Sequence, residues 1–459
     1  MKSKTKVNFV CQECGYDSPS WLGKCPECGS WNSMKEIRIS SLPVSPSGSR
    51  ASFLANTLST PKTLSEVIYT EKSRIQTAFE EFNTVLGGGI VKGAAMLIAG
   101  DPGVGKSTLL LQLALSLARG PVKSQQKTSH KVLYVSGEES VEQIKMRAER
   151  IKNQKSFGSS DGLLLLAITD TDAIVRQIEE TKPDLVIIDS IQTVESQNVS
   201  GLSGSVAQVR YSALQFVRIA KLLNIPIIIV GHVTKEGMVA GPMVLSHMVD
   251  TVLFLEGEKF AKTRILRSLK NRFGPVDEVG IFLMEEEGMT EAKNPEQLFL
   301  ANSGSDKVSV PGSVLVVTLE GSRAFLVELQ ALTVRSSLPM PRRVVSGIDP
   351  RRVELLLAVL QKHCRLPLDT MDVFVNVAGG LKLSDPAIDL GICLSVYSSL
   401  QNVALGTTVG IAEVGLLGEL RMVNGLEKRT KEAEKLGFKK IMTAKTHKTL
   451  KDVLVSLGK

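Results

Sequence analysis

The sequence predicts an α/β fold in three parts: a small cysteine-rich module, a central domain with a mostly parallel sheet covered by helices on both faces, and a C-terminal α+β domain. Four of the six cysteines precede residue 30. Between residues 71 and 290, short and nearly uninterrupted apolar runs alternate with helical patterns, as expected for strands buried on both faces. A polar passage at 294–306 precedes a new pattern of strands and helices, and 459 residues suit about three domains.

The N-terminal module, residues 1–35, carries two Cys-x2-Cys pairs. The four cysteines are Cys11, Cys14, Cys25 and Cys28. Two such pairs can present four thiolates tetrahedrally to one ion, as in closed structural zinc sites, and metal binding would supply the folding energy of so small a segment. A redox role is disfavoured because neither pair lies in a thioredoxin-like βαβ unit. The spacing leaves open whether zinc or iron is bound, and whether Trp21 and Trp31 stack on bases or on protein.

Residues 36–70 are expected to form a linker, because the stretch from 40 to 61 is rich in Ser and Pro and poor in large apolar residues. The central domain follows at residues 71–290. Its expected strands are Ala95–Ala99, Val132–Ser136, Leu163–Ile168, Leu185–Ile188, Ile225–Val230 and Thr251–Leu255.

A complete G-x4-G-K-S/T motif is the strongest signal in the chain. It comprises Gly100, Asp101, Pro102, Gly103, Val104, Gly105, Lys106, Ser107 and Thr108. The motif follows an apolar strand and opens a helix expected over 108–119 that stops at Gly120, so a phosphate would meet a helix N-terminus. Backbone amides would surround the β-phosphate, Lys106 would reach the β and γ oxygens, and the Ser107 hydroxyl would ligate magnesium. The motif therefore predicts a site for ATP and Mg²⁺.

Polar side chains follow three other expected strands of this domain. Asp189 comes directly after a buried strand and is expected to hold magnesium through water, as a Walker B aspartate does. Glu138 and Glu139 follow a second strand at the edge where ligands bind in such sheets, and either could orient the attacking water. Glu138 is the favoured candidate, and an acidic helix start is the alternative for both. His232, after a third strand, is interpreted as a sensor of the γ-phosphate or as an ordinary hydrogen-bonded histidine.

The C-terminal domain is expected at residues 305–459. It should contain strands at 313–319, 325–329 and 372–377 and an amphipathic helix at 350–361. A further helix is expected to begin at Asp385, which is a good N-cap, with Pro386 in the first helical position.

The chain carries a formal charge of +8 and has a pI near 9.0. This charge suits a polyanionic partner such as nucleic acid, although an ordinary solvated surface explains it equally well. The basic N-terminus lacks the apolar core of a signal peptide, and no apolar run is long enough to span a bilayer. The expectation is a cytoplasmic protein without membrane contact.

Over essentially its whole length, the sequence resembles the bacterial RadA (Sms) family of DNA repair proteins. The resemblance rests on the four-cysteine module, the phosphate loop, a family pentapeptide and the region from about Asp369, in the expected order. The pentapeptide is Lys270, Asn271, Arg272, Phe273 and Gly274. The resemblance implies a RecA-like P-loop ATPase core, the cofactors ATP, Mg²⁺ and Zn²⁺, assembly into a homo-hexamer, and RecA-type recombinases as partners.

In RecA-like and DnaB-like rings, cations at the place of this pentapeptide reach the ATP of the adjoining subunit. The resemblance therefore implies that Lys270 and Arg272 stabilise transition-state charge in trans. It also implies single-stranded and branched DNA as partners, with ATP turnover driving branch migration. The segments expected to contact DNA are 195–206 and 235–244, and Arg342, Arg343, Arg351 and Arg352 are further candidates or only solubilising charge.

The C-terminal domain resembles the proteolytic domain of Lon, which uses a Ser-Lys dyad. At the matching positions this sequence has Ala387 and Glu427, so peptide cleavage would lack its nucleophile and its base. Ser384 and Lys428 lie close enough in sequence to leave the alignment open. The favoured function is a DNA-dependent ATPase acting as a motor or helicase in DNA repair. An ATP-dependent protease and a nucleotide-switched adaptor that does not translocate are the rival hypotheses.

Overall fold

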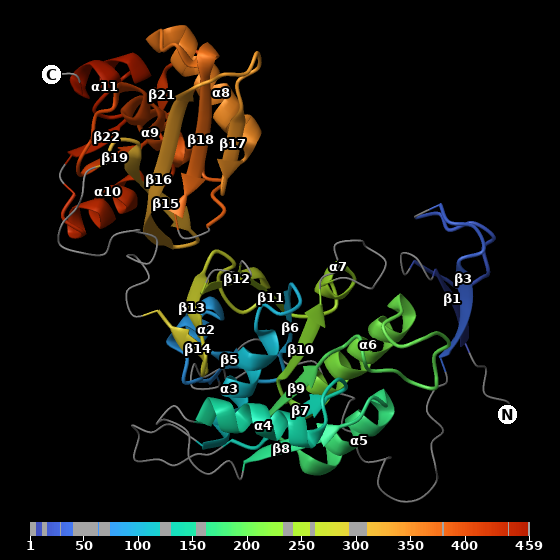
Figure 1. The fold of residues 1–459 in the computed structure, drawn as a ribbon. Coiled ribbons are helices and arrows are strands. Elements are labelled where there is room, and N and C mark those ends of the chain that lie inside the picture. The colour runs from blue at the N-terminus through green and yellow to red at the C-terminus, as the bar shows by residue number, and fades with distance from the viewer. Residues whose placement is uncertain are drawn as a thin grey trace, which may run out of the picture. The chain divides into compact units, whose positions relative to one another are not determined.

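The computed structural model describes residues 6–11, 16–27, 29–39, 63, 74–119, 130–152, 162–232, 242–257, 262–292, 310–378, 381–438 and 440–457. Within these ranges the chain divides into two compact units, the first holding most residues up to 291 and the second most of those that follow. Figure 1 shows the elements of each unit. In this part of the chain, no helix combines the length and the apolar character needed to cross a membrane.

A nine-stranded sheet forms the centre of the first unit, in the order β14-β13-β12-β11-β6-β10-β9-β7-β8. All six expected strands are confirmed. They are β6 (Ala95–Gly100), β7 (Val132–Ser136), β8 (Leu163–Ala167), β9 (Leu185–Asp189), β10 (Ile227–His232) and β11 (Thr251–Glu256). These six run parallel to one another. The continuous apolar runs therefore mark strands that are buried on both faces.

Helices cover both faces of this sheet, as predicted. They are α2 (Glu80–Val85), α3 (Lys106–Arg119), α4 (Val141–Lys152), α5 (Thr171–Thr181), α6 (Val206–Leu223) and α7 (Pro242–Ser246). Apolar residues of α2, α3 and α4 join one core cluster, and those of α5, α6 and α7 join another. Side chains alternate along each strand, so each of the six parallel strands contributes to both clusters.

An antiparallel extension, of which the last two strands were not predicted from the sequence, completes the sheet on the β11 side. It consists of β12 (Thr263–Asn271), β13 (Val279–Glu285) and β14 (Gly288–Glu291). The fully buried Gln112 of α3 donates its amide to the carbonyl oxygen of Met289 at 3.0 Å and accepts from the Met289 amide at 2.8 Å. The short strand β14 is thus hydrogen-bonded to α3. A separate small pair joins β4 (Arg74–Ile75) to β5 (Ile90–Val91).

The N-terminal module is a three-stranded sheet in the order β2-β1-β3. Its strands are β1 (Lys6–Cys11), β2 (Asp17–Ser18) and β3 (Met34–Ile39). The strand β3 continues four residues past the expected end of the module at 35, because it pairs with β1 as far as Ile39 opposite Lys6. Residues 36–39 are therefore strand rather than linker. The rest of the predicted linker, apart from Thr63, lies outside the described residues.

The second unit contains a mixed six-stranded sheet in the order β17-β18-β16-β15-β19-β22. Its strands are β15 (Ser313–Glu320), β16 (Arg323–Arg335), β17 (Arg343–Ser346), β18 (Met371–Val377), β19 (Thr408–Ile411) and β22 (Lys440–Thr443). Its helices are α8 (Pro350–Cys364), α9 (Asp389–Gln401), α10 (Leu426–Lys435) and α11 (Leu450–Leu457). A two-stranded hairpin joins β20 (Glu413–Val414) to β21 (Leu420–Arg421). The predicted α+β class is confirmed, and the likeness to the Lon domain stays a prediction.

The helix that was expected to start at Asp385 begins with a tighter turn. Residues Pro386–Ile388 form a 3-10 helix, and the α-helix α9 starts only at Asp389. The capping interaction itself is present, since the Asp385 carboxylate accepts a hydrogen bond from the Ala387 amide at 3.0 Å. The sequence thus located the N-cap and missed the first, tighter turn.

Candidate nucleotide site and its surroundings

The phosphate loop connects the end of β6 to the start of α3. Gly103 has a φ of +77° and open space around the position of a Cβ. Gly105 has a φ of +110°, and a Cβ there would overlap the methyl groups of Met284 and Met289. The backbone of this turn therefore requires glycine at both positions. It leaves the amides before α3 facing the space where a phosphate would bind.

Lys106 is only 3% exposed and curls back over this loop. Its Nζ donates to the carbonyl oxygens of Gly100 and Asp101 at 2.8 and 3.0 Å. Burial lowers the pKa of Lys106, while the charges of Asp189, Asp101 and Glu138 act in the opposite direction. The ammonium group therefore lies within the loop, where phosphate oxygens could replace the two carbonyls.

Asp189 lies at the end of β9 and is 6% exposed. It accepts a hydrogen bond of 2.6 Å from the hydroxyl of Tyr134. Burial and the neighbouring Asp189 charge raise the pKa of Tyr134 well above its usual value, so the phenol keeps its proton and orients the carboxylate. The Tyr134 hydroxyl occupies one lone pair and leaves other carboxylate lone pairs for a water bound to Mg²⁺. The donor set of Ser107 and Asp189 suits this ion, which prefers oxygen ligands.

The two candidate glutamates have different partners. Glu138 accepts from the Ser190 hydroxyl at 2.8 Å, and its Oε1 lies 3.5 Å from Nε2 of His232. Glu139 forms an ion pair with Arg147 at 2.8 Å, and Arg147 also donates to the Tyr134 hydroxyl at 3.4 Å. Of the two glutamates, Glu138 is thus the one that contacts Ser190, directly after β9, and His232, at the end of β10.

His232 is the last residue of β10 and pairs in register with Gly100, the last residue of β6. Burial lowers its pKa, the charge of Lys106 lowers it further, and the charges of Glu138 and Asp189 oppose both effects. Its Nδ1 is buried and has no hydrogen-bond partner among the described residues. Gln192, from the turn after β9, donates to the carbonyl oxygen of His232 at 3.3 Å, and its own buried Oε1 also lacks a partner in this part of the chain.

The pentapeptide at the end of β12 lies at the opposite edge of the sheet. Thr251 pairs with Asn271 in β12 and with Met96 near the start of β6. A strand rises about 3.3 Å per residue, so Met96 lies on the order of 13 Å from Gly100, where the phosphate loop begins. The pentapeptide is therefore not brought together with Lys106, Glu138 and Asp189 of the same chain.

The residues of the pentapeptide differ in how firmly they are held. Lys270 donates to the carbonyl oxygens of Ser246 and Val249 at 2.6 and 2.8 Å, at the end of α7. Burial and the adjacent Arg272 charge lower the pKa of Lys270. The Asn271 side chain accepts from the Phe273 amide at 3.0 Å, which stabilises the turn that continues through Gly274. In contrast, the side chain of Arg272 is 59% exposed.

Two cysteines of the N-terminal module make equivalent backbone hydrogen bonds. The Cys11 amide donates to the carbonyl oxygen of Tyr16 at 2.8 Å, and the Cys25 amide donates to that of Ser30 at 2.9 Å. Both cysteines are buried in one cluster together with Met34. The other two predicted ligands, Cys14 and Cys28, lie outside the described residues. Two buried thiols at equivalent positions of paired turns fit one tetrahedral zinc ion. Trp21 and Trp31 are 54% and 72% exposed.

The first segment that was expected to contact DNA, 195–206, is held by a buried glutamine. Gln208 of α6 accepts from the Ser196 amide at 2.9 Å and donates to the carbonyl oxygen of Val199 at 2.7 Å. The exposed tip of this loop carries Leu202, which is 85% exposed. Of the second segment, 235–244, residues 235–241 lie outside the described residues.

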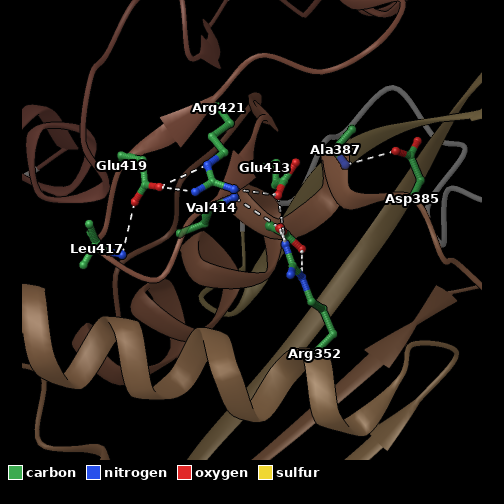
Figure 2. Close-up of polar contacts among 9 residues, drawn as sticks. Arg352, Asp385, Ala387, Glu413, Val414, Leu417, Glu419 and Arg421 are labelled. Atoms are coloured by element: carbon green, nitrogen blue, oxygen red, sulfur yellow. Dashed lines mark hydrogen bonds and ion pairs between the residues drawn. The ribbon is translucent and has the colours of Figure 1, made fainter.

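The positions predicted to correspond to the Lon dyad carry neither a hydroxyl group nor an amine. Ala387 is fully buried, and the Glu427 carboxylate is 85% exposed and 4.0 Å from Nζ of Lys445. Ser384 and Lys428 are both exposed, and no hydrogen bond joins them within the described ranges. Figure 2 shows Ala387 beside Asp385, with Arg352, Glu413 and Arg421 linked in a separate set of ion pairs. The described geometry thus offers no Ser-Lys dyad.

Sequence reasoning missed several residues of these sites, namely Tyr134, Arg147, Ser190, Gln192 and Gln208. The only available signal was position: Ser190 and Gln192 directly follow the Asp189 strand. The others became apparent only when the fold brought distant segments together.

Comparison with known proteins gives consistent matches along the chain. Residues 60–238 match the family described as AAA domain, and residues 9–36 match the rubredoxin metal binding domain. The chain is 47% identical over 443 residues to the DNA repair protein RadA of Bacillus subtilis, covering 96% of this chain and 93% of the relative. It is 48% identical over 441 residues to the DNA repair protein RadA of Halalkalibacterium halodurans, with the same coverage. The crystal structure of the RadB recombinase matches 48% of this chain and 99% of its own, at 22% identity and a TM-score of 0.38.

Proposed function

Since the chain belongs to the RadA family of DNA repair proteins, with an AAA ATPase domain and a rubredoxin-like zinc ribbon, we propose that it hydrolyses ATP to move along single-stranded DNA. This movement would promote branch migration of recombination intermediates. One observation supports the proposal most strongly: Lys106, Asp189 and Glu138 follow or end the parallel strands β6, β9 and β7, and they meet at the edge of the sheet where such sheets bind ligands.

Phosphate binding would use the ammonium group of Lys106, which donates to two carbonyl oxygens of the loop. When a triphosphate enters, the ammonium group would exchange the carbonyls of Gly100 and Asp101 for the β and γ oxygens. Bound Mg²⁺, held by Ser107 and through water by Asp189, would supply charge neutralisation to these oxygens. The remaining positioning would come from the amides of the loop and the N-terminus of α3.

Hydrolysis would depend on Glu138 rather than Glu139. Its carboxylate accepts a hydrogen bond from Ser190 and lies beside His232. It could accept a proton from a water molecule that attacks the γ-phosphate, or orient that water. Glu139 is already paired with Arg147. His232 would then report the state of the γ-phosphate through Glu138.

Arg272 would complete the site of a neighbouring subunit. It lies at the edge of the sheet opposite its own phosphate loop and is well exposed, as a residue acting in trans must be. A charge supplied in this way accelerates phosphoryl transfer by about 10³ to 10⁵ in other enzymes. Lys270 would mainly stabilise the end of α7, since its ammonium group already donates hydrogen bonds to two carbonyl oxygens there. This arrangement supports a closed ring, and the proposed assembly is a homo-hexamer.

Coupling to DNA would pass through Gln192. This residue bridges the turn after β9, which leads into 195–206, and the end of β10, which leads toward 235–244. A change at His232 would therefore be transmitted to the residues that precede both segments that are proposed to contact DNA.

The zinc ribbon, with exposed Trp21 and Trp31, would serve contacts with DNA or with a RecA-type recombinase. The C-terminal domain would serve assembly and DNA binding without proteolysis.

The decisive experiment measures ATP hydrolysis by the purified full chain with and without single-stranded DNA, at increasing salt. A motor predicts strong stimulation by DNA that declines steeply between about 50 and 200 mM salt, because phosphate contacts release counterions. Lys106→Ala serves as the inactive control. A rate that is the same with and without DNA would reject the motor.

The adaptor hypothesis predicts a different pattern. It expects nucleotide-dependent binding of recombination proteins, with no ATP-driven displacement of a strand from a forked substrate. Unwinding or branch extension of such a substrate by the wild-type chain, but not by Lys106→Ala, would exclude it. Degradation of casein would instead restore the protease hypothesis.

A further inference from the structure

Asp250 is a buried carboxylate beside the pentapeptide, at the residue before β11 begins. It is 4% exposed, and its Oδ2 accepts from the Ala95 amide at 3.0 Å and from Nζ of Lys221. Its Oδ1 lies 3.3 Å from Nη1 of Arg272. In addition, its carbonyl oxygen accepts from the Arg272 amide at 3.1 Å. Asp250 thus contacts Arg272 through both its side chain and its main chain.

The two cations around Asp250 are bound unequally. Burial alone would raise the pKa of Asp250, but the hydrogen bonds from Lys221 and Ala95 and the charges of Lys221 and Arg272 outweigh burial and lower it. The carboxylate is therefore ionised at neutral pH. Lys221 makes the shorter contact, and its Nζ also lies 5.7 Å from the centre of the Phe273 ring. Arg272 makes the longer contact and is the more exposed of the two cations.

This geometry holds the backbone of Arg272 firmly and its guanidinium loosely. The main-chain hydrogen bond to Asp250 and the contact of Lys221 with Phe273 fix the turn of the pentapeptide at the edge of the sheet. Because Lys221 already neutralises Asp250, moving the guanidinium away would not leave an unpaired buried charge. An unpaired buried carboxylate would otherwise make such a movement costly.

We infer that Asp250 is a positioning residue for Arg272: it orients the guanidinium at the strand ends opposite its own phosphate loop, toward a triphosphate in a neighbouring copy of this chain. Lys221 is its partner, since it keeps Asp250 charged and paired when Arg272 moves to that triphosphate. The inference rests on the proposed function, in which Arg272 acts in trans. Asp250 itself touches no substrate.

The test is a double-mutant cycle on DNA-stimulated ATP hydrolysis by the full chain. Asp250→Asn preserves the shape of the side chain and an oxygen that can accept from Ala95, but removes the charge that orients Arg272. We expect kcat to fall by about tenfold to a hundredfold, as for a lost charged hydrogen bond, with KM for ATP changed less than about twofold. In an Arg272→Ala background the same substitution should change kcat less than about twofold, because the residue through which it acts is gone.

A structural role for Asp250 would give a different result. If the carboxylate only stabilised the start of β6, Asp250→Asn would reduce kcat by the same factor in both backgrounds, and the inference would be overturned. Asp184→Asn is the matched control: this carboxylate belongs to the same domain, accepts from the Lys131 amide at 2.8 Å and is 51% exposed. It should leave kcat within about twofold of wild type.

Two further outcomes are distinguishable. If Arg272→Ala hydrolyses ATP at the wild-type rate, the assignment of Arg272 in the proposed function fails, and this inference fails with it. If Arg272→Ala is impaired while Asp250→Asn is normal, the inference alone is overturned.

Should Asp250→Asn not fold, Lys221→Gln tests the same claim. In this variant Asp250 would have Arg272 as its charged partner and would bind the guanidinium more strongly. The kcat should therefore fall when Lys221→Gln is made in the otherwise wild-type chain, and it should stay unchanged when the substitution is made in the Arg272→Ala chain. An unchanged kcat in the Arg272 background would overturn the inference.

Discussion

Glu138 and Glu139 are adjacent in sequence but have different neighbours in the fold. The first contacts Ser190 and His232 at the edge of the nucleotide site, and the second is held by Arg147. Glu138→Gln should therefore lower kcat by about 10² to 10⁴, the usual contribution of a positioned proton acceptor, while ATP binding is retained.

Glu139→Gln is the control for this prediction and should change kcat by no more than severalfold. Steady-state hydrolysis together with the binding of a fluorescent ATP analogue measures both properties. Equal losses in the two variants would show that Glu138 has no special role.

At the scale of single residues, contiguous motifs were predictable and long-range partners were not. The phosphate loop and Asp189 follow local rules that link a residue type to the end of a strand. Tyr134 lies 55 residues from Asp189 in sequence, and Asp250 lies 155 residues from the amide of Ala95 that it accepts from. No local pattern relates these partners. Their roles follow only from the order of the strands.

At the scale of elements, the parallel strands were predictable because they are apolar on both faces. The last two strands of the antiparallel extension were not, and the final one, β14, is only four residues long. A strand at the edge of a sheet is covered less completely, so its composition is closer to that of a loop. The tighter turn before α9 was missed because capping signals do not distinguish a 3-10 turn from the start of an α-helix.

The elements β15, η6 (Pro386–Ile388) and α10 of the C-terminal domain are joined by a buried ion pair. Arg429 is 3% exposed and donates to Asp385 and to the carbonyl oxygen of Val317, both at 2.6 Å. Arg429→Met should destabilise this domain by about 1.5 to 3 kcal/mol, because the partly buried Asp385 would lose its charged donor while it keeps the hydrogen bonds from the Leu319 and Ala387 amides. Hydrogen exchange measured on peptides from residues 310–457 reports this loss directly.

Arg421→Met is the matched control for that prediction. Arg421 pairs with Glu419 at 2.6 Å and is 56% exposed, so its loss should cost no more than about 1 kcal/mol. If both variants lowered protection from hydrogen exchange equally, the burial of Arg429 would not explain the contribution of its ion pair to stability.

At the scale of the whole molecule, both tryptophans of the chain lie in the zinc ribbon, so tryptophan emission reports on that module alone. Trp21 is restrained by a hydrogen bond from its Nε1 to the carbonyl oxygen of Met34 at 3.2 Å. Removal of zinc by a chelator should unfold the module and lower the anisotropy of tryptophan emission, since metal supplies most of its folding energy. The DNA-independent rate of ATP hydrolysis should change little. Unchanged anisotropy after complete zinc removal would contradict the prediction.

The trans assignment makes a prediction about mixed assemblies. Lys106→Ala retains Arg272, and Arg272→Ala retains an intact phosphate loop. Each variant alone should be nearly inactive, but an equimolar mixture should recover about a quarter of the wild-type rate if subunits pair at random. The recovery arises where the first variant supplies its arginine to the second. Subunit exchange followed by an ATPase assay checks this, and no recovery would indicate action within one subunit.

The hydrogen bonds between Gln112 and Met289 have a mechanical consequence. They join β14, the last strand before the segment 293–309, to the helix whose first residue is Lys106. Tension on the chain beyond Ala292 would therefore reach α3 through the Gln112 side chain, in addition to the sheet through the pairing of β14 with β13. A triphosphate bound at the start of α3 would stabilise this helix against that tension. Release of the triphosphate would remove this stabilisation.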